Sequence, residues 1–318
     1  MVHTHSSYQW GFSVLIAPVA PPVPVPVYGK GGFDYVTIDS ARRRVYAAHK
    51  GSNRLLIVDA DSGKVRGQVV VGPMQGSAHD PVTGLVFTGN GDGKSVSEVD
   101  PETMRVVRTV ALPGPVDAIA YDPATHRVYA DEDTGTVVYV IDTKTMRLTA
   151  QVPLPGHDEE YLSVDPRTHV VYQNVPDKRE FVEIDPVTLR VTKTVPTPQL
   201  VSDHPLQYDA KLDRIVDGGQ NGVMTVFTPA GRLVGQGTFP PGVDQCTLDQ
   251  QSDELACAGK GVISVMRVGA SGAPVMLAKL DTHHPGLRSI AIDAKTGYLW
   301  AAWTGPQGDF IERFRLTQ

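Results

Sequence analysis

The sequence predicts an all-β fold, a seven-bladed β-propeller built from four-stranded antiparallel blades. Two observations lead to it. A segment of about 40 residues recurs seven times along the chain, and each copy contains short β-branched runs separated by turn residues. Four strands per repeat and seven repeats are the numbers of a seven-bladed propeller. No apolar run with helical periodicity of useful length competes with this interpretation.

Each repeat begins with a run that closes in aspartate, such as FDYVTID at 33–39 and VDAIAYD at 116–122. The spacing between successive closing aspartates stays between 40 and 44 residues, which chance rarely produces. The closing aspartates are Asp39, Asp80, Asp122, Asp165, Asp209, Asp249 and Asp293. We expect each of these runs to be the first strand of a blade.

The remaining strands follow in a constant order. A polar turn such as PVTG (81–84) leads to a second apolar run, for example RVYAA at 44–48. A turn rich in Gly, Asn or Asp, such as DEDTG (131–135), precedes a third run like VYVID (138–142). A last turn leads to a fourth run such as RVVRTVAL (105–112). Short β-branched runs between turn residues are typical of antiparallel meanders, so each repeat is predicted to form one blade.

The seventh repeat contains only three such runs before the sequence ends, near 287–293, 298–303 and 309–316. We therefore expect its fourth strand to come from the N-terminal segment, residues 1–29, somewhere within 10–27. The single propeller domain would span residues 30–318. Closing the ring in this way removes the open sheet edge that an unclosed propeller would expose.

The N-terminal apolar run at 12–19 has two interpretations, a degenerate export signal or an edge strand, because it is short and lacks a basic start. Ring closure favours the strand, and we expect Trp10 to accompany it. The Pro-rich segment 21–27 cannot be a central strand and suits an outer edge or a connection.

Composition excludes two classes of partner. The formal net charge of −6 argues against nucleic acid, which requires a basic face, and the triplet Arg42, Arg43 and Arg44 is expected to be a solvated turn. No apolar segment approaches the length of a membrane-spanning helix. The remaining candidates are a small molecule or a partner protein.

The first strand of each blade lies innermost in a propeller and lines the central channel. The residue five positions before each closing aspartate is therefore expected at the mouth of the channel. Read round the ring, these residues are Asp34, Gln75, Asp117, Glu160, His204, Asp244 and Arg288. Repeats that agree elsewhere diverge here into four carboxylates, an amide, an imidazole and a guanidinium.

Neighbouring loops add more ionisable groups to this mouth, which we call the funnel. The stretch HDEEYLSVD (157–165) places several directly before a first strand. The added residues are His157, Asp158, Glu159, Asp203, His283 and His284 from crossing loops, and His49, Lys50 and Glu132 from loops between second and third strands. A wet channel mouth tolerates any polar residue, which is one interpretation. In the other, clustered carboxylates raise one another's pKa unless a cation compensates them.

Under the second interpretation, Glu160, His204 and Asp244 are the candidate metal ligands, because they fall on three consecutive blades. Mixed carboxylate and imidazole ligands suit Ca²⁺, Mn²⁺ or Zn²⁺. The candidate catalytic residues are His157 or His284 as general base and Arg288 as holder of a substrate oxyanion. The candidate ligand-binding residues are Asp34, Gln75, Asp117, Glu159, His49 and Glu132.

Segments such as VYAAHKGSNRLLIVD (45–59) and VYADEDTGTVVYVID (128–142) resemble the repeats of the YVTN family of seven-bladed propellers. The resemblance covers roughly residues 30–318. It implies export to the periplasm or outside the cell. It also implies a binding protein for a small ligand, a divalent cation or a partner protein, with a lactonase-like hydrolase or a lyase as the alternative.

Two further features carry structural expectations. Cys246 and Cys257 align with positions that face each other across the first hairpin of a blade, so a disulfide and a pair of buried thiols both remain open. His79, His126 and His169 fall near turns on the opposite face from the funnel, and we expect them to be surface or packing residues.

Overall fold

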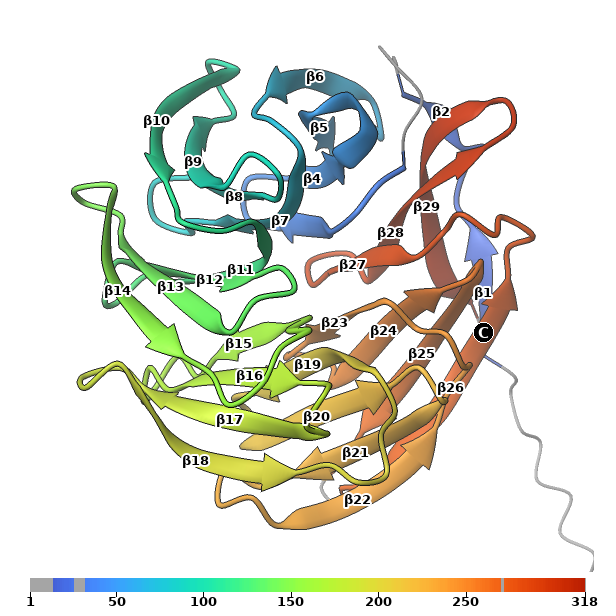
Figure 1. Ribbon diagram of the computed structural model, residues 1–318. Helices are drawn as coiled ribbons and strands as arrows, with labels where there is room; N and C mark the ends of the chain where they lie inside the picture. The colour runs from blue at the N-terminus through green and yellow to red at the C-terminus, as the bar shows by residue number, and fades with distance from the viewer. Residues whose placement is uncertain (1–13, 26–31, 270–271, 318) are drawn as a thin grey trace, which may run out of the picture.

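Seven antiparallel sheets surround a central channel in the computed structural model, which describes residues 14–25, 32–269 and 272–317 (Figure 1). The predicted all-β propeller of four-stranded blades is confirmed. The innermost strands are β3 (Val36–Asp39), β7 (Met74–His79), β11 (Val116–Asp122), β15 (Leu162–Val164), β19 (Asp203–Asp209), β23 (Gln245–Asp249) and β27 (Ser289–Asp293). Innermost strands of adjacent blades contact one another.

Each blade continues outward through second and third strands. The second strands are β4 (Arg44–His49), β8 (Val86–Asn90), β12 (Arg127–Glu132), β16 (Val171–Val175), β20 (Arg214–Gly219), β24 (Glu254–Gly259) and β28 (Tyr298–Gly305). The third strands are β5 (Arg54–Asp59), β9 (Ser95–Asp100), β13 (Val137–Asp142), β17 (Glu180–Asp185), β21 (Val223–Phe227), β25 (Val262–Val268) and β29 (Gly308–Thr317).

The outer strands complete the blades. They are β6 (Val65–Val70), β10 (Arg105–Ala111), β14 (Arg147–Pro153), β18 (Arg190–Pro196), β22 (Leu233–Thr238), β26 (Pro274–Asp281) and, in the last blade, β1 (Leu15–Pro18). A single 3₁₀ turn, η1 (Lys50–Ser52), joins β4 and β5. No helix in the described part of the chain is long and apolar enough to cross a membrane.

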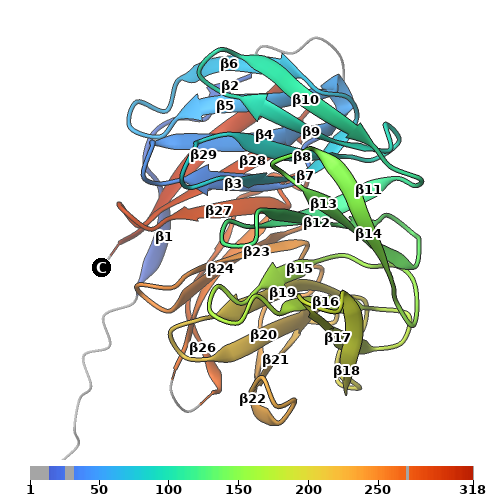
Figure 2. The same cartoon turned by 90° about the vertical axis from the view of Figure 1, so that its left-hand side faces the viewer.

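The N-terminal strand closes the ring, as the sequence predicts. Strand β1 pairs antiparallel with β29, with Leu15 opposite Thr317, so the blue strand lies beside the red strands of the last blade (Figure 2). The short strand β2 (Val23–Pro24), within the Pro-rich segment, pairs further along β29. Trp10 lies outside the described residues.

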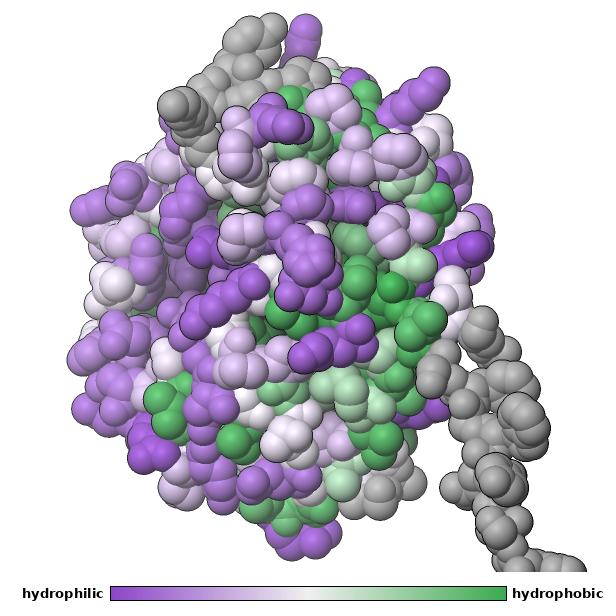
Figure 3. Space-filling model, turned by 90° about the vertical axis from the view of Figure 1, so that its right-hand side faces the viewer, coloured by the Kyte–Doolittle hydropathy of each residue, from purple (hydrophilic) through white to green (hydrophobic). Residues whose placement is uncertain are grey.

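Strand β1 also holds the last two blades together. Its Ile16 is buried with Ala278 of β26 in one apolar cluster, and the two outer strands contact each other. Apolar side chains gather on this side of the molecule among hydrophilic ones (Figure 3). Leu15 on β1 and Val275 on β26 are exposed there.

The closing aspartates explain why the turn sequences recur. In the second blade, one oxygen of Asp80 accepts the Val82 backbone N–H at 2.8 Å and the other accepts the Thr83 hydroxyl at 2.7 Å. This arrangement is an Asx-turn, in which the side chain satisfies backbone donors that the strand leaves free. Asp122, Asp165 and Asp293 accept the corresponding Thr hydroxyl in their own blades.

The arginine triplet lies in such a turn but is not solvated throughout. Arg43 is only 8% exposed, and its guanidinium is 2.7 Å from Asp293 of the last blade. Arg42 donates to the Pro81 and Val82 carbonyls of the second blade. The triplet therefore ties the first blade to both neighbours.

Candidate functional site

The seven predicted mouth residues lie together at one end of the channel. Each stands at or near the start of an innermost strand, and hydrogen bonds or ion pairs join several neighbouring pairs of them. Gln75 donates to Asp117 at 2.7 Å, Arg288 contacts Asp34, and His204 lies next to Glu160. Their functional roles stay predictions.

One half of the funnel is electrically balanced. Lys50 Nζ lies 3.3 Å from an Asp34 oxygen and also donates to Gln75. Arg288 lies 3.3 Å from carboxylate oxygens of both Asp34 and Asp244. Two carboxylates of the funnel therefore already have cationic partners, and Arg288 is engaged by both of them.

The other half is acidic without compensation. Asp117, Asp131, Asp133 and Glu160 approach one another there, and no lysine or arginine nitrogen of the described residues lies within 4.0 Å of their carboxylates. Burial, followed by the charges of Asp131 and Asp244, raises the pKa of Glu160 to about 8. Burial and the nearby Asp34 raise the pKa of Asp117 well above its usual range.

His204 is a neutral imidazole beside this acidic half. Burial lowers its pKa. Its Nε2 lies 2.9 Å from the Gln220 amide nitrogen and 3.5 Å from a Glu160 oxygen. The amide donates, so Nε2 accepts and the proton resides on Nδ1, which is buried without a hydrogen-bond partner.

The predicted metal ligands are only partly assembled. Glu160 and His204 are adjacent, whereas Asp244 pairs with Arg288. Within the described ranges, no group of three His, Cys, Asp or Glu side chains is arranged to hold a metal ion. The metal site stays a prediction.

Two of the predicted ligand-binding residues are used elsewhere. His49 has no exposed side-chain surface, because it stacks on Phe33 with ring centroids 4.7 Å apart and its Nε2 lies 2.7 Å from Asp309. It links the first and last blades instead of facing the funnel. Glu132 accepts the Tyr139 hydroxyl at 2.6 Å and caps its own hairpin. Each of the two residues ends a second strand, His49 in β4 and Glu132 in β12, and the side chain of each is engaged by a neighbour within the propeller.

The candidate catalytic residues do not converge. His284 stacks on Trp303 with ring centroids 3.7 Å apart, and its Nε2 is 3.9 Å from Glu312 within the last blade. His157 stands on the crossing loop between β14 and β15 and contacts Asp158 and Asp177. Arg288 alone of the three lies within the ring of mouth residues.

A side pocket of about 290 Å³ opens beside Glu160, between the loops of the third, fourth and fifth blades. It is lined by the carboxyl groups of Asp133, Asp158, Glu159, Glu160 and Asp177, and Ser202 also belongs to its lining. Glu159 is 2% exposed, and neither carboxylate oxygen has a hydrogen-bond partner. Burial raises the pKa of Glu159 to about 9.

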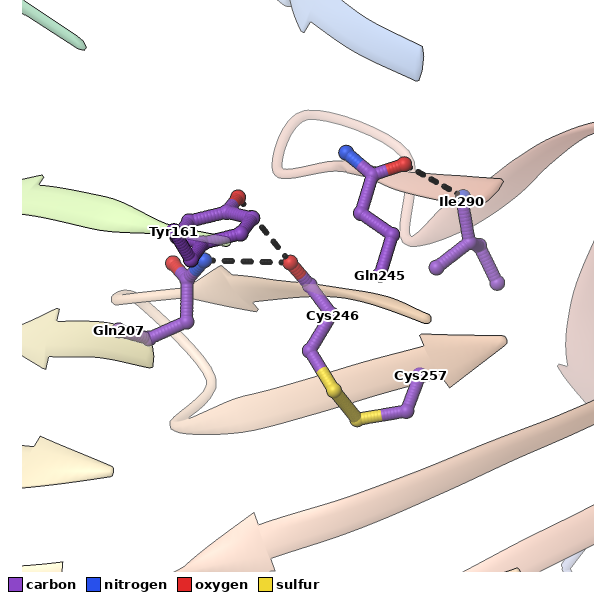
Figure 4. The surroundings of a disulfide bond; sticks show 6 residues. All are labelled: Tyr161, Gln207, Gln245, Cys246, Cys257 and Ile290. Carbon is purple, nitrogen blue, oxygen red and sulfur yellow. Dashed lines mark hydrogen bonds between the residues drawn. A yellow bond between two sulfur atoms is a disulfide. The ribbon is translucent and has the colours of Figure 1, made fainter. Parts of the chain in front are cut away.

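Hydrogen bonds connect different blades around the channel (Figure 4), and we call this layer the floor of the funnel. The Cys246 carbonyl accepts from the Tyr161 hydroxyl at 3.4 Å and from the Gln207 amide at 3.1 Å. The Gln245 side-chain oxygen accepts the backbone N–H groups of Val36 and Ile290, both at 3.1 Å. A disulfide joins Cys246 to Cys257 on the paired strand, which settles the alternative left open by the sequence.

Below this floor lies a lower cavity of about 380 Å³, lined by neutral residues and by His79. Burial lowers the pKa of His79. His126 and His169 have positive φ angles of 55° and 64° in the turns of their blades, and His169 contacts Asp122. All three lie away from the funnel, as expected.

The sequence prediction missed Asp131 and Asp133, which belong to the turn segment DEDTG (131–135). The fifth residue of the second strand offered a signal. Where the third blade has Asp131, five blades have Ala or Gly, such as Ala48 and Gly89, and the fourth has the neutral Asn174. A fully buried carboxylate at that place, bonded to the Ala118 N–H at 2.7 Å, is the exception within the repeat.

Comparison with known proteins supports the architecture. No protein-family model and no curated protein matches this sequence. Among solved structures, a chain of Kuenenia stuttgartiensis hydrazine synthase is similar, with a TM-score of 0.75 and 14% identity. The match covers 90% of this chain and 96% of that chain. At this identity the likeness concerns the fold alone, and the chain is a seven-bladed β-propeller.

Proposed function

We propose that this chain is a YVTN-type propeller that binds a positively charged small ligand in the acidic half of its funnel. One observation carries the proposal. Asp131 is fully buried and the half-buried Asp117 and Glu160 lie close to it, while Lys50 and Arg288 engage the opposite half. A propeller fold is consistent with ligand or partner binding, and the uncompensated negative charge of the carboxylates favours a positively charged ligand.

The physical argument is one of compensation. Buried carboxylates that repel one another keep protons at neutral pH, or they lose them to a cation that takes their place. A divalent cation such as Ca²⁺, Mn²⁺ or Zn²⁺ and a small organic cation both meet this requirement. Binding would release protons, so the affinity rises with pH up to the pKa of Glu160, about 8.

Isothermal titration calorimetry tests this proposal with Ca²⁺, Mn²⁺, Zn²⁺ and ethylammonium as cations and acetate as the anion. At least one cation should bind and acetate should not. Glu160→Gln should lower the affinity for the bound cation by about tenfold or more. Glu102→Gln is the matched control, since Glu102 is an exposed glutamate of an outer turn. The proposal fails if no cation binds or if both variants behave alike.

The alternative, a metal-dependent hydrolase or lyase, rests on the Glu160–His204 pair at 3.5 Å. These residues would supply two of the three predicted ligands, and a bound metal would polarise a lactone carbonyl or stabilise an enolate. A screen for lactone hydrolysis or elimination in the presence of Mn²⁺ or Zn²⁺ tests it.

We also propose that the protein is exported to the periplasm or outside the cell. The disulfide between Cys246 and Cys257 supports this, because disulfides persist in oxidising compartments and are rare in the cytosol. Fractionation of cells that produce the full chain tests it, and a signal confined to the reducing cytosol would refute it.

A further inference from the structure

The side pocket lies between loops of the third and fourth blades, with Ser202 added from the loop before β19 of the fifth blade. Asp133 comes from the hairpin loop after β12, Asp158, Glu159 and Glu160 from the crossing loop before β15, and Asp177 from the loop after β16. Its volume of about 290 Å³ is at the small end for a ligand site. Five carboxyl groups thus surround one small space.

The two ends of the pocket differ in their partners. At the outer end, the exposed His157 imidazole lies 3.0 Å from an Asp158 oxygen and 3.4 Å from an Asp177 oxygen. Lys178 also contacts Asp177, at 3.0 Å. At the inner end, no lysine or arginine nitrogen of the described chain lies within 4.0 Å of Asp133, Glu159 or Glu160.

Glu159 is the strongest sign of a missing partner. Both of its oxygens are buried without a hydrogen bond, although the residue belongs to the lining of the pocket. A buried carboxyl group without any partner costs about 1–3 kcal/mol or more. A cationic group in the pocket would remove this cost.

The distribution of the carboxylates distinguishes an extended cation from a metal ion. A Ca²⁺ ion needs six to eight oxygens converging at about 2.3–2.6 Å. The described residues contain no such convergent group of three side chains, and the carboxylates instead stand on separate loops around the pocket. An ammonium group donates three hydrogen bonds, so a chain with one at each end could meet carboxylates at both ends.

We propose that the side pocket binds a small linear diamine. Its inner ammonium pairs with Asp133, Glu159 and Glu160, and its outer ammonium replaces the His157 imidazole between Asp158 and Asp177. This inference rests on the proposed function, because Glu160 belongs to both the funnel and the pocket. It adds a ligand class and a second point of contact.

Calorimetric titration of the full chain with 1,4-diaminobutane, 1-aminobutane, Ca²⁺ and a lysine-containing peptide tests the inference. The diamine should bind with one site per chain, and the monoamine about tenfold more weakly or worse, the value of one charge-assisted contact. Glu159→Gln should weaken both amines. Asp158→Asn combined with Asp177→Asn should weaken only the diamine, which then binds no better than the monoamine. Glu102→Gln is the control, and thermal melts verify that each variant folds.

The outcomes separate this inference from the proposed function. If Ca²⁺ or ethylammonium binds through Glu160 but the diamine gains nothing over the monoamine, the funnel proposal stands and the diamine is refuted. If no cation binds, both fail. If only a lysine-containing peptide binds, the pocket recognises a partner protein's side chain and the small-molecule inference is overturned.

Discussion

Glu159→Gln should change how the stability of this protein depends on pH. In the folded chain the pKa of Glu159 is about 9 because the carboxyl group is buried, against an ordinary value of 4.5 in the unfolded chain. Between those values the folded state holds a proton that the unfolded state has lost. The free energy of unfolding therefore falls as pH rises. The stability that comes from this proton is fully present only below the pKa of the unfolded state, and it is lost as pH rises through the pKa of the folded state.

The magnitude follows from the width of the window. Each pH unit between the two pKa values is worth about 1.36 kcal/mol for one group. From pH 5 to pH 8, wild type should therefore lose up to about 4 kcal/mol through Glu159 alone. Glutamine titrates in neither state, so the variant avoids this loss and gains stability relative to wild type as pH rises.

Urea unfolding followed by circular dichroism at pH 5, 6.5 and 8 measures the effect in buffers without added cations. The quantity to compare is the difference between variant and wild type at each pH, which cancels the titration of all other groups. Glu102→Gln, at a glutamate whose side chain is 59% exposed, is the control. Parallel pH curves for wild type and Glu159→Gln would refute the buried, protonated Glu159. A saturating cationic ligand should flatten the wild-type curve.

Three further outcomes are expected. Glu160→Gln combined with His204→Ala should abolish any turnover or cation binding while the melting temperature stays near that of wild type, because the mouth adds little to the blade cores; an unfolded double variant would make these residues structural. Arg43→Met should lower the free energy of unfolding by about 3 kcal/mol in urea titrations, since it leaves the buried Asp293 carboxylate without its ion pair. A change under about 0.5 kcal/mol, the range of ordinary surface substitutions, would show that the Arg43–Asp293 ion pair does not stabilise the contact between the first and last blades. Reduction of the Cys246–Cys257 disulfide should lower the free energy of unfolding by about 3 kcal/mol, the value expected for a sequence separation of 11 residues. Urea unfolding with and without dithiothreitol measures this loss.

The fold could be predicted because it depends on features that the chain repeats. The closing aspartates recur since each one caps the turn that follows it, as Asp80 does through Thr83. The missing fourth strand of the last blade pointed to the N-terminus, and β1 lies there. Such signals are local and need no knowledge of side-chain direction.

The site was predicted less completely, because side-chain direction at loops is a tertiary property. His49 ends β4 on the expected face, yet its ring lies in the core against Phe33 and Asp309 of neighbouring segments. Asp131 was overlooked as a turn residue, although its place inside β12 makes it a buried acid. Position along a repeat could therefore be inferred, but partners from other blades could not.

One residue type has opposite electrostatic states in this fold, and the partner decides which. Asp100 accepts the Thr103 hydroxyl at 2.8 Å and two backbone N–H groups, so its pKa is lowered and the charge is stable in its turn. Asp117 is buried beside Asp34 and receives one amide donor from Gln75, so its pKa is raised. Turn carboxylates thus have donors within their own repeat, whereas funnel carboxylates face other carboxylates across blades. Only the second kind gains free energy from an external cation, and for that reason the ligand is expected at the funnel and not at the many other aspartates of the propeller.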